Sequence, residues 1–235
     1  MGHSQTEPSV AVVIPALDEE RAIVRVLAEL PREHVREVVV VDNGSTDRTA
    51  EVARAAGATV VHEPHRGYGA ACLAGLARLR DRPPEIVAFL DADGSDDPAQ
   101  LPELLEPILA GRSDLVIGSR ALGEQERGAL TPVQAAGNRL AVLLLRWAFG
   151  ARFTDLGPFR AVRWGALEGL RMRDRDYGWT VEMQARAARA RLRTAEIPVR
   201  YRRRVGRSKI SGTLRGAAGA GWKILFTIAR VRLGG

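Results

Sequence analysis

The first half of the chain alternates short apolar runs with segments of helical spacing. The apolar runs are Val10–Ile14, Val38–Val41, Thr59–His62, Ile86–Leu90 and Leu115–Gly118. Helices are predicted after PALDEE, where Ile23, Val26, Leu27 and Leu30 recur at helical spacing, from about Arg48 to Ala56, from the loop HRGYG onward, and from Pro98 to Ala110. Strands that alternate with helices of this length predict an α/β fold with a mostly parallel, doubly wound sheet.

The run Ile86–Leu90 ends abruptly in carboxylates, in the sequence IVAFLDADGSDD. Open α/β sheets bind ligands at the carboxyl ends of their strands, so these acids are predicted to lie at a binding site. A hard divalent cation, Mg²⁺ or Mn²⁺, would relieve the repulsion between them. Asp96 or Asp97 is predicted to cap the helix that begins at Pro98. Asp91 and Asp93 are predicted to bind the metal, because a buried strand rarely ends on two unpaired acids.

Acidic and amide side chains also follow the first two strands. Asp18, Glu19 and Glu20 follow the first strand, and Asp42 and Asn43 follow the second. Such groups can accept hydrogen bonds from ribose hydroxyls or a base N–H, although Asp42 could equally serve as a cap. No GxGxxG follows the first strand, and acids there would repel a pyrophosphate, so a dinucleotide site is disfavoured.

The second half is expected to carry further helices and two strands. Helices are predicted over Gln134–Phe149, Val181–Ala190 and Gly212–Leu233, and strands over Phe159–Val162 and, as an edge strand bearing Pro198, over Glu196–Tyr201. The apolar helices are too charged to span a bilayer. The expected organisation is a disordered tail over residues 1–9, one domain over 10–211, and an amphipathic helix over 212–235 that contacts a membrane surface or a second copy of the chain.

The charge balance points to an anionic partner. The 235 residues carry a formal net charge of +7, and arginine and lysine crowd into residues 186–215. Nucleic acid is disfavoured, because no aromatic platform accompanies these residues and the acid-tipped strands would repel a phosphate backbone. An anionic membrane surface or a phosphorylated substrate remains. The single cysteine, Cys72, allows no intramolecular disulfide, so a cytoplasmic location is expected.

Seven motifs occur in order over residues 10–212: VVIPALDEE, VVVVDNGSTDRT, RGYGAA, FLDADGSDDP, GSR, TDLGPFRA and RYRRRVGRSK. This series resembles family 2 glycosyltransferases of the GT-A fold and, more narrowly, the dolichyl- or polyprenyl-phosphate sugar synthases. The resemblance implies a UDP- or GDP-linked sugar donor, a divalent metal, inversion at the anomeric carbon and a lipid-phosphate acceptor. It also implies a peripheral position at the cytoplasmic face of the membrane.

The resemblance assigns roles to individual positions. It implies that donor-binding residues are Pro15, Ala16, Leu17, Glu19, Asp42, Asn43, Gly67, Gly69, Asp91, Ala92 and Asp93, with Asp91 and Asp93 also holding the metal. It places Arg120, Arg203 and Lys209 against the diphosphate or the acceptor phosphate. Asp93 and these three basic residues are therefore the expected catalytic group, with Glu182 as a fifth member.

The chain departs from the family pattern at two informative places. Ser95 stands where a glutamine is common, which leaves the third metal ligand open, and YGWTVEMQ offers Glu182 as the one base candidate in its segment. An ionised acceptor phosphate needs no base, whereas a hydroxyl acceptor would need Glu182. Pairing of Glu182 with Arg186 at i+4 explains this residue equally well. The alternative function is a soluble transferase acting on a small phosphorylated or hydroxylated acceptor.

Overall fold

The computed structural model describes residues 8–206 and 214–233, with the side chains of the last helix described from Lys223 onward. The first half contains β1 (Val10–Ala16), α1 (Ile23–Glu29), β2 (Val35–Asp42), α2 (Thr49–Ala55), β3 (Thr59–His62), α3 (Tyr68–Leu79), β4 (Ile86–Phe89), α4 (Leu101–Leu109) and β5 (Leu115–Ser119). The second half contains α5 (Pro132–Phe149), β6 (Arg160–Arg163), α6 (Trp164–Leu170), α7 (Trp179–Arg189), β7 (Thr194–Pro198) and α8 (Leu214–Arg232). Short 3₁₀ turns cover Arg32–His34 and Pro98–Gln100.

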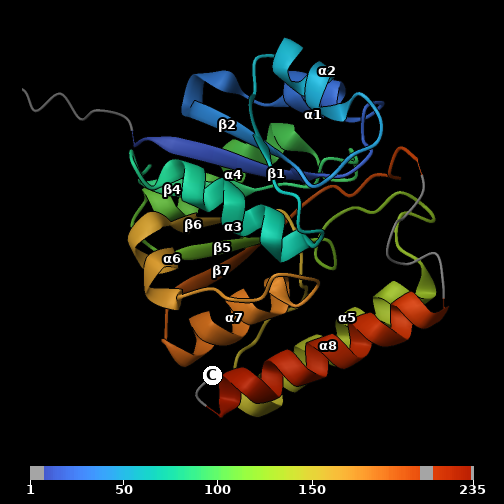
Figure 1. The fold of residues 1–235 in the computed structure, drawn as a ribbon. Coiled ribbons are helices and arrows are strands. Elements are labelled where there is room, and N and C mark those ends of the chain that lie inside the picture. Colours follow the sequence, from blue (N-terminus) through green and yellow to red (C-terminus); the bar gives the residue numbers. More distant parts are fainter. Residues whose placement is uncertain (1–7, 207–213, 234–235) are drawn as a thin grey trace, which may run out of the picture.

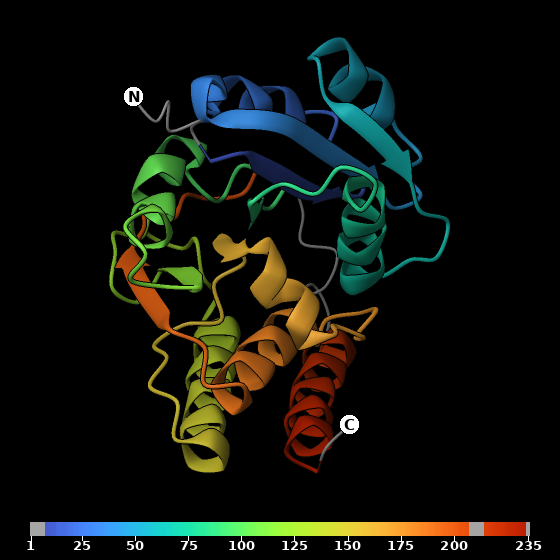
Figure 2. The same cartoon turned by 90° about the vertical axis from the view of Figure 1, so that its left-hand side faces the viewer.

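The strands form one sheet in the order β3-β2-β1-β4-β6-β5-β7 (Figures 1 and 2). Every neighbouring pair is parallel except those of β6, which runs antiparallel to both β4 and β5. The predicted mostly parallel sheet is therefore confirmed. Ala16 pairs with Asp42, and Val13 pairs with Phe89, so the carboxyl ends of β1, β2 and β4 meet at one edge.

Side chains of alternating strand positions fill two cores, one on each face of the sheet. In β1, Val12 and Ile14 pack toward α1 and α4, whereas Ala11 and Val13 pack toward α3 and α7. Helix α3 lies so close to the sheet that a Cβ on Gly75 would come within 2.5 Å of a methyl carbon of Val13. The first half of the chain thus forms a rigid platform beneath the ligand edge.

Two elements in the second half, β7 and α6, differ from prediction. Strand β7 begins at Thr194 and ends at Pro198, where a strand over Glu196–Tyr201 was expected. Proline has no N–H to continue the ladder, and Tyr201 instead bridges to Asp96 and Gln125. Helix α6 was not predicted, since its seven residues are too few to show a clear helical period.

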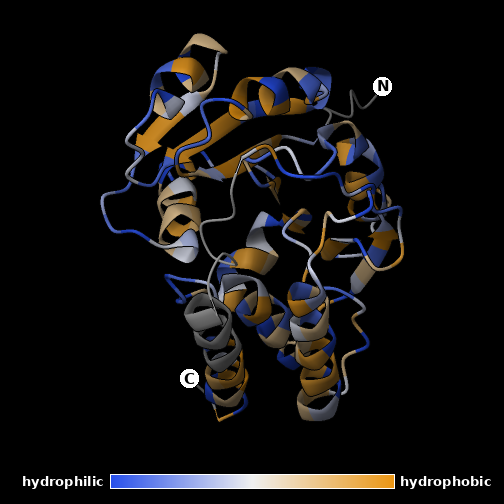
Figure 3. Ribbon diagram, turned by 90° about the vertical axis from the view of Figure 1, so that its right-hand side faces the viewer, coloured by the Kyte–Doolittle hydropathy of each residue, from blue (hydrophilic) through white to orange (hydrophobic). Residues whose placement is uncertain are grey.

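Helices α5 and α8 project from the sheet layers side by side and also pack on α7 (Figures 1 and 3). Apolar residues of α5 stay exposed at Val133, Leu140, Leu143 and Trp147, as do Leu225 and Phe226 of α8. Within the described ranges, neither these nor any other helix combines the length and apolarity needed to cross a bilayer.

Candidate functional site

The residues after β4 form a compact loop of carboxylates, here called the acid loop (residues 91–97). Asp93 Oδ1 accepts a hydrogen bond from the Ser95 N–H at 2.9 Å, and Asp96 Oδ2 accepts one from the Asp91 N–H at 3.3 Å. Burial and the charge of Asp93 raise the pKa of Asp91 to about 6. Burial, Asp91 and Asp93 raise the pKa of Asp96 well above its usual range. Asp97 caps the turn that follows by accepting from the Ala99 N–H, which confirms the cap predicted at Asp96 or Asp97.

A later segment, here called the strap (residues 199–206), lies along the acid loop. The Arg202 N–H donates to the Ser95 carbonyl at 2.7 Å, and the Val205 N–H donates to the Asp93 carbonyl at 2.9 Å. Because alternate side chains of an extended segment point the same way, every second arginine meets the acids. Arg200 and Arg202 pair with Asp97 at 2.6 and 2.8 Å, and Arg204 pairs with Asp93 at 2.7 Å.

The basic residue that reaches the acid loop from the strap is not the one predicted to bind phosphate. Arg203, predicted at the diphosphate or acceptor phosphate, turns away from the acid loop. Its Nε donates to the Arg127 carbonyl at 2.7 Å, and its N–H donates to Glu126. The neighbouring Arg204, which the resemblance did not single out, pairs with Asp93 instead. The period-two spacing of RYRRR was the signal that could have revealed it. Lys209 lies outside the described residues.

Arg120 is held rigidly at the other side of the site. Its Nε and Nη2 donate to the two oxygens of Asp155, each at 2.7 Å, and its guanidinium lies 5.1 Å from the centre of the Tyr201 ring. Burial lowers the pKa of Arg120, but the hydrogen bonds and charge of Asp155 outweigh it and raise that pKa above its usual range. The guanidinium is thus a fixed positive charge that needs no reorganisation to meet an anion.

The edge formed by β1 and β2 brings the predicted donor-binding positions together. Ala16 pairs with Asp42, its carbonyl accepts the Asn43 N–H at 2.9 Å, and Pro15, Leu17 and Glu19 lie on either side of it along the chain. Asp42 accepts from the Ser45 N–H at 3.1 Å and lies 3.2 Å from His62 Nδ1, so it forms a local turn and does not cap a helix.

The amide of Asn43 is committed to the protein. Its Nδ2 donates to the carbonyls of Glu63 and His65 at 3.0 and 2.8 Å, and its Oδ1 accepts the Gly67 N–H at 2.8 Å. This side chain ties the end of β2 to the loop before α3. Protein groups thus already engage both polar atoms of this side chain, and a contact between Asn43 and the donor stays a prediction.

Gly67 and Gly69 are required by protein packing. A Cβ on Gly67 would come within 2.1 Å of the Arg175 carbonyl oxygen, and one on Gly69 within 2.0 Å of the Asp174 carbonyl oxygen. The start of α3 is therefore pressed against residues 174–176. These contacts explain both glycines without a ligand, and a role beside the nucleotide base stays a prediction.

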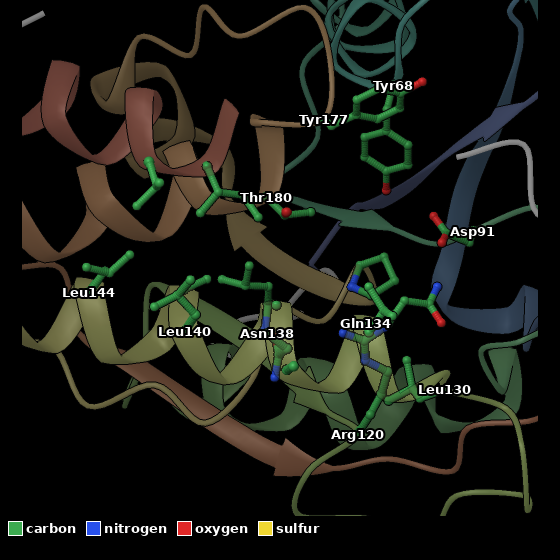
Figure 4. A pocket seen from close by; sticks show the side chains of 18 residues that line it. Tyr68, Asp91, Arg120, Leu130, Gln134, Asn138, Leu140, Leu144, Tyr177 and Thr180 are labelled. Carbon is green, nitrogen blue, oxygen red and sulfur yellow. The ribbon is translucent and has the colours of Figure 1, made fainter. Parts of the chain in front are cut away.

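A cavity of about 610 Å³, here called the groove, runs from Asp91 and Arg120 between α5 and α8 (Figure 4). Asp91 and Arg120 lie near one end, and Leu140 and Leu144 of α5 lie toward the other. The lining residues are mostly apolar; they are Tyr68, Asp91, Arg120, Leu130, Val133, Gln134, Ala136, Gly137, Asn138, Leu140, Ala141, Leu144, Leu156, Pro158, Tyr177, Thr180, Ile224 and Leu225. Tyr68 lies beside Asp91 and opposes part of the rise in the pKa of that carboxylate.

Glu182 does not face this groove. Its side chain is 0% exposed, and it accepts from the N–H groups of Arg173 and Asp174 at 3.0 and 2.7 Å. It also pairs with Arg186 at 2.9 Å and with Arg230 of α8 at 3.0 Å. The structure contradicts the predicted base role, because a buried carboxylate bound to two guanidiniums and two N–H groups has no free approach to a substrate. The alternative pairing with Arg186 at i+4 is confirmed.

The acid loop suits a divalent cation that brings ligands of its own. Asp91 and Asp93 offer hard oxygen ligands, and a cation there would relieve the repulsion that raises the Asp91 pKa. Asp96 Oδ1 is buried and has no hydrogen-bond partner among the described residues. No cluster of three acidic, histidine or cysteine side chains arranged for metal binding occurs in the described ranges. Such a cation would therefore complete its coordination with ligand oxygens or water.

Comparison with known proteins identifies the family to which the chain is similar. The model of the family "Glycosyl transferase family 2" matches residues 11–176. An uncharacterised glycosyltransferase of Mycobacterium tuberculosis is 40% identical over 225 residues, which are 92% of this chain and 98% of the relative. An undecaprenyl-phosphate mannosyltransferase of Micrococcus luteus is 34% identical over 222 residues, covering 89% and 90% of the two chains.

A solved structure shares the fold over nearly the whole chain. Glucosyl-3-phosphoglycerate synthase from Mycobacterium tuberculosis, crystallised with Mn²⁺, UDP-glucose and phosphoglyceric acid, superposes with a TM-score of 0.75 and 25% identity. The similarity covers 96% of this chain and 80% of that one. The order of the strands, the acid loop after β4 and the family match agree, and the chain belongs to glycosyl transferase family 2, with the GT-A fold.

Proposed function

We propose that this protein transfers a sugar, with inversion, from a nucleotide-diphosphate sugar to a polyprenyl phosphate. The observation that carries the proposal is the groove, which joins an apolar channel to Asp91 and Arg120. A ligand that fits has an anionic head and a long apolar tail. The undecaprenyl-phosphate mannosyltransferase of Micrococcus luteus, a relative at 34% identity, acts on a molecule of this kind.

The two ends of the groove suit the two ends of such an acceptor. Leu140, Leu144 and Leu225 offer the tail apolar surface, and burial of apolar area contributes roughly 25 cal/mol per Å². Arg120 offers the phosphate a guanidinium already oriented by Asp155. A small polar acceptor would leave most of this apolar lining in contact with water.

The donor is assigned to the edge where β1, β2 and β4 end. The base and ribose would lie along Pro15 to Glu19 and Asp42, and the diphosphate would reach the acid loop. Asp91 and Asp93 would hold Mg²⁺ or Mn²⁺, as the residues there permit. When bound, this cation neutralises charge on the departing nucleoside diphosphate. The structural relative with Mn²⁺ and UDP-glucose supports this arrangement.

The chemistry requires one bond to form and one to break. An acceptor phosphate oxygen attacks the anomeric carbon, and the bond from that carbon to the diphosphate oxygen breaks on the opposite face. The acceptor phosphate is already ionised near pH 7, so no base must remove a proton. This fits the groove, in which Asp91 is the one acidic residue among the described residues that line it, and it fits the burial of Glu182.

A lipid-linked acceptor also requires contact with a bilayer. Leu140, Leu143 and Trp147 of α5 and Phe226 of α8 are between 50% and 85% exposed, and we call them the apolar stripe. Arg139 and Arg146 of α5 are exposed as well. An apolar face with basic residues suits the headgroup region of an anionic membrane, with the protein bound peripherally at the cytoplasmic face.

The second candidate is a small phosphorylated acceptor. The observation in its favour is the structural similarity to glucosyl-3-phosphoglycerate synthase, whose acceptor is phosphoglyceric acid. Arg120 could bind its phosphate as well as that of a lipid. A hydroxyl nucleophile would, however, need a base, and Glu182 is buried.

The two candidates are separated by a direct assay. Purified protein with Mn²⁺ and UDP- or GDP-linked hexoses is offered a short-chain prenyl phosphate in detergent or 3-phosphoglycerate, and products are identified by mass spectrometry. We expect the prenyl product. Product from 3-phosphoglycerate alone would establish the second candidate.

Two substitutions on α5 make the assay specific for the groove. Leu140→Glu places a charge in the groove and should lower kcat/KM for the prenyl phosphate by roughly tenfold or more. Leu143→Glu, on the same helix but outside the groove lining, should leave kcat/KM in detergent unchanged. Equal effects of both variants would contradict the assignment of the acceptor tail to the groove.

A further inference from the structure

The strap delivers a cation of the protein itself to the acid loop. Arg204 Nη2 lies 2.7 Å from Asp93 Oδ2, in a pair whose side chains are 30% and 7% exposed. Asp93 Oδ1 meanwhile accepts the Ser95 N–H at 2.9 Å. Both oxygens of Asp93 are therefore engaged, one by a backbone group and one by a guanidinium.

We propose that Arg204 competes with the divalent cation for Asp93. A metal bound at Oδ2 would meet the positive charge of the Arg204 guanidinium, whereas one bound at Oδ1 would share that oxygen with the Ser95 N–H. Exchange at Oδ2 replaces one cation by another and leaves the loop backbone intact, whereas binding at Oδ1 would weaken the turn of the acid loop. The exchange at Oδ2 is accordingly the favoured route, and Arg204 sets the affinity of the loop for metal. This inference rests on the metal-binding part of the proposed function.

The strap can release this side chain without leaving the loop. Its attachment rests on hydrogen bonds that do not involve the Arg204 side chain, from the Arg202 N–H to Ser95 and from the Val205 N–H to Asp93. Arg200 and Arg202 add ion pairs to Asp97, which lies beyond the metal-binding pair of acids. Arg204 thus has a fixed backbone and a long side chain that reaches Asp93 from partly open surroundings.

The charges around Arg204 also favour competition over simple anchoring. Burial lowers the pKa of Arg204, but the charges of Asp93, Asp91 and Glu19 outweigh it and raise that pKa. The guanidinium therefore stabilises several negative groups at once. Removing it leaves Asp91 and Asp93 less compensated, which strengthens their attraction for a divalent cation.

If the pair between Arg204 and Asp93 were purely structural, removing Arg204 would lower the affinity for metal instead of raising it. If Arg204 served only to order the acid loop, its loss would let Asp93 move and would weaken metal binding. The direction of the change in metal affinity therefore distinguishes the two roles, which a loss of activity could not do.

The experiment measures Mn²⁺ binding to the full chain, without nucleotide, by electron paramagnetic resonance. Arg204→Gln should bind Mn²⁺ about tenfold more tightly than wild type, since a charged hydrogen bond no longer competes. Arg204→Lys, which keeps the charge, should bind less tightly than Arg204→Gln. Arg203→Gln is the matched control, because the neighbouring guanidinium contacts the Arg127 carbonyl, and it should bind as wild type does.

The outcomes separate this inference from the proposed function. Equal or weaker Mn²⁺ binding by Arg204→Gln, with the variant folded by circular dichroism, overturns the competition while leaving the transferase assignment standing. Equal tightening in Arg203→Gln would also overturn it, because the effect would then be one of net charge. Absence of Mn²⁺ binding in wild type and Arg204→Gln alike would remove both the competition and the proposed metal site.

Discussion

The acid loop gathers four carboxylates in a largely buried place. Asp91, Asp93 and Asp96 follow a buried strand, and two of them have raised pKa values. Arg204 and Arg120 compensate part of this charge, and the remainder makes the loop receptive to a cation. The acid loop can bind a cation because the neighbouring arginines do not cancel all of its negative charge.

This imbalance predicts a pH dependence of stability. The pKa of Asp91 is about 6 in the folded protein and lower in the unfolded chain, so the folded state holds the proton more tightly. The resulting stabilisation is complete below about pH 4 and is lost as the pH rises through about 6. We expect Asp91→Asn to gain stability relative to wild type between pH 4 and 7. Thermal unfolding in EDTA at several pH values measures this gain, and a constant difference in Tm would contradict it.

The sequence predicted the acids of the site better than their partners. Asp91 and Asp93 could be identified because an apolar run ends on them. The spacing of RYRRR indicates that Arg200, Arg202 and Arg204 share a side, but not that this side meets the acid loop; that contact, and the one between Asp155 and Arg120, join segments distant in sequence. The base role and the pairing with Arg186 stayed open for Glu182 for the same reason: sequence spacing does not show which protein groups bind a carboxylate.

Among the helices, α8 is fastened to the domain by buried charge. Lys223 and Thr227 reach Asp174 at 3.3 and 3.4 Å, and Arg230 reaches Glu182 at 3.0 Å. These α8 residues recur at steps of four and three, so they share one face of the helix. The same helix contributes Ile224 and Leu225 to the groove, so these ion pairs fix one wall of it.

Replacement of Glu182 should therefore destabilise the protein and leave its chemistry nearly unchanged. Glu182→Ala leaves Arg186, Arg230 and two N–H groups without their carboxylate, and we expect a loss of about 3 kcal/mol in the free energy of unfolding. Urea denaturation measures the loss, with exposed Glu168→Ala as control. A base role would give the reverse pattern, with normal stability and little turnover by the folded enzyme.

Element prediction was most accurate where the hydrophobic period was long or repeated. The strands and helices up to β5 were found because each strand is a short run rich in strand-forming residues between helical patterns. The end of β7 was misplaced because Val199 and Tyr201 of the strap are buried although they lie beyond the strand, and buried residues of an extended segment resemble a strand in sequence. The strap is thus a segment that the sheet does not include but the site requires.

At the scale of the whole molecule, the apolar stripe exposes large apolar side chains on two helices that pack on each other. Trp147 is 85% exposed and Phe226 52% exposed, on adjoining helices. The side chain of Trp222, in the helix predicted to contact a membrane surface or a second copy, lies outside the described residues. A face of this kind fits a membrane surface or a second copy of the chain.

Sedimentation with anionic liposomes tests this face. We expect wild type to sediment at low salt, partly released by high salt because each basic residue near anionic lipid contributes roughly 1 kcal/mol. Trp147→Glu with Phe226→Glu should largely abolish sedimentation. Leu109→Glu, a similarly exposed site at the end of α4, should not. Wild type that stays in the supernatant and elutes as a dimer would assign the stripe to self-association.

The groove has a kinetic consequence because Leu140 and Leu225 both line it and remain 50% and 40% exposed. Leu140 belongs to both the groove and the apolar stripe, so the groove is accessible from the face that would contact the membrane. A lipid acceptor could therefore enter the groove directly from the bilayer without passing through water. The rate would then depend on the mole fraction of the acceptor among the membrane lipids and not on its concentration in the whole sample. Adding inert lipid at constant total acceptor should slow turnover in proportion to the dilution, whereas adding buffer should leave the rate per vesicle unchanged.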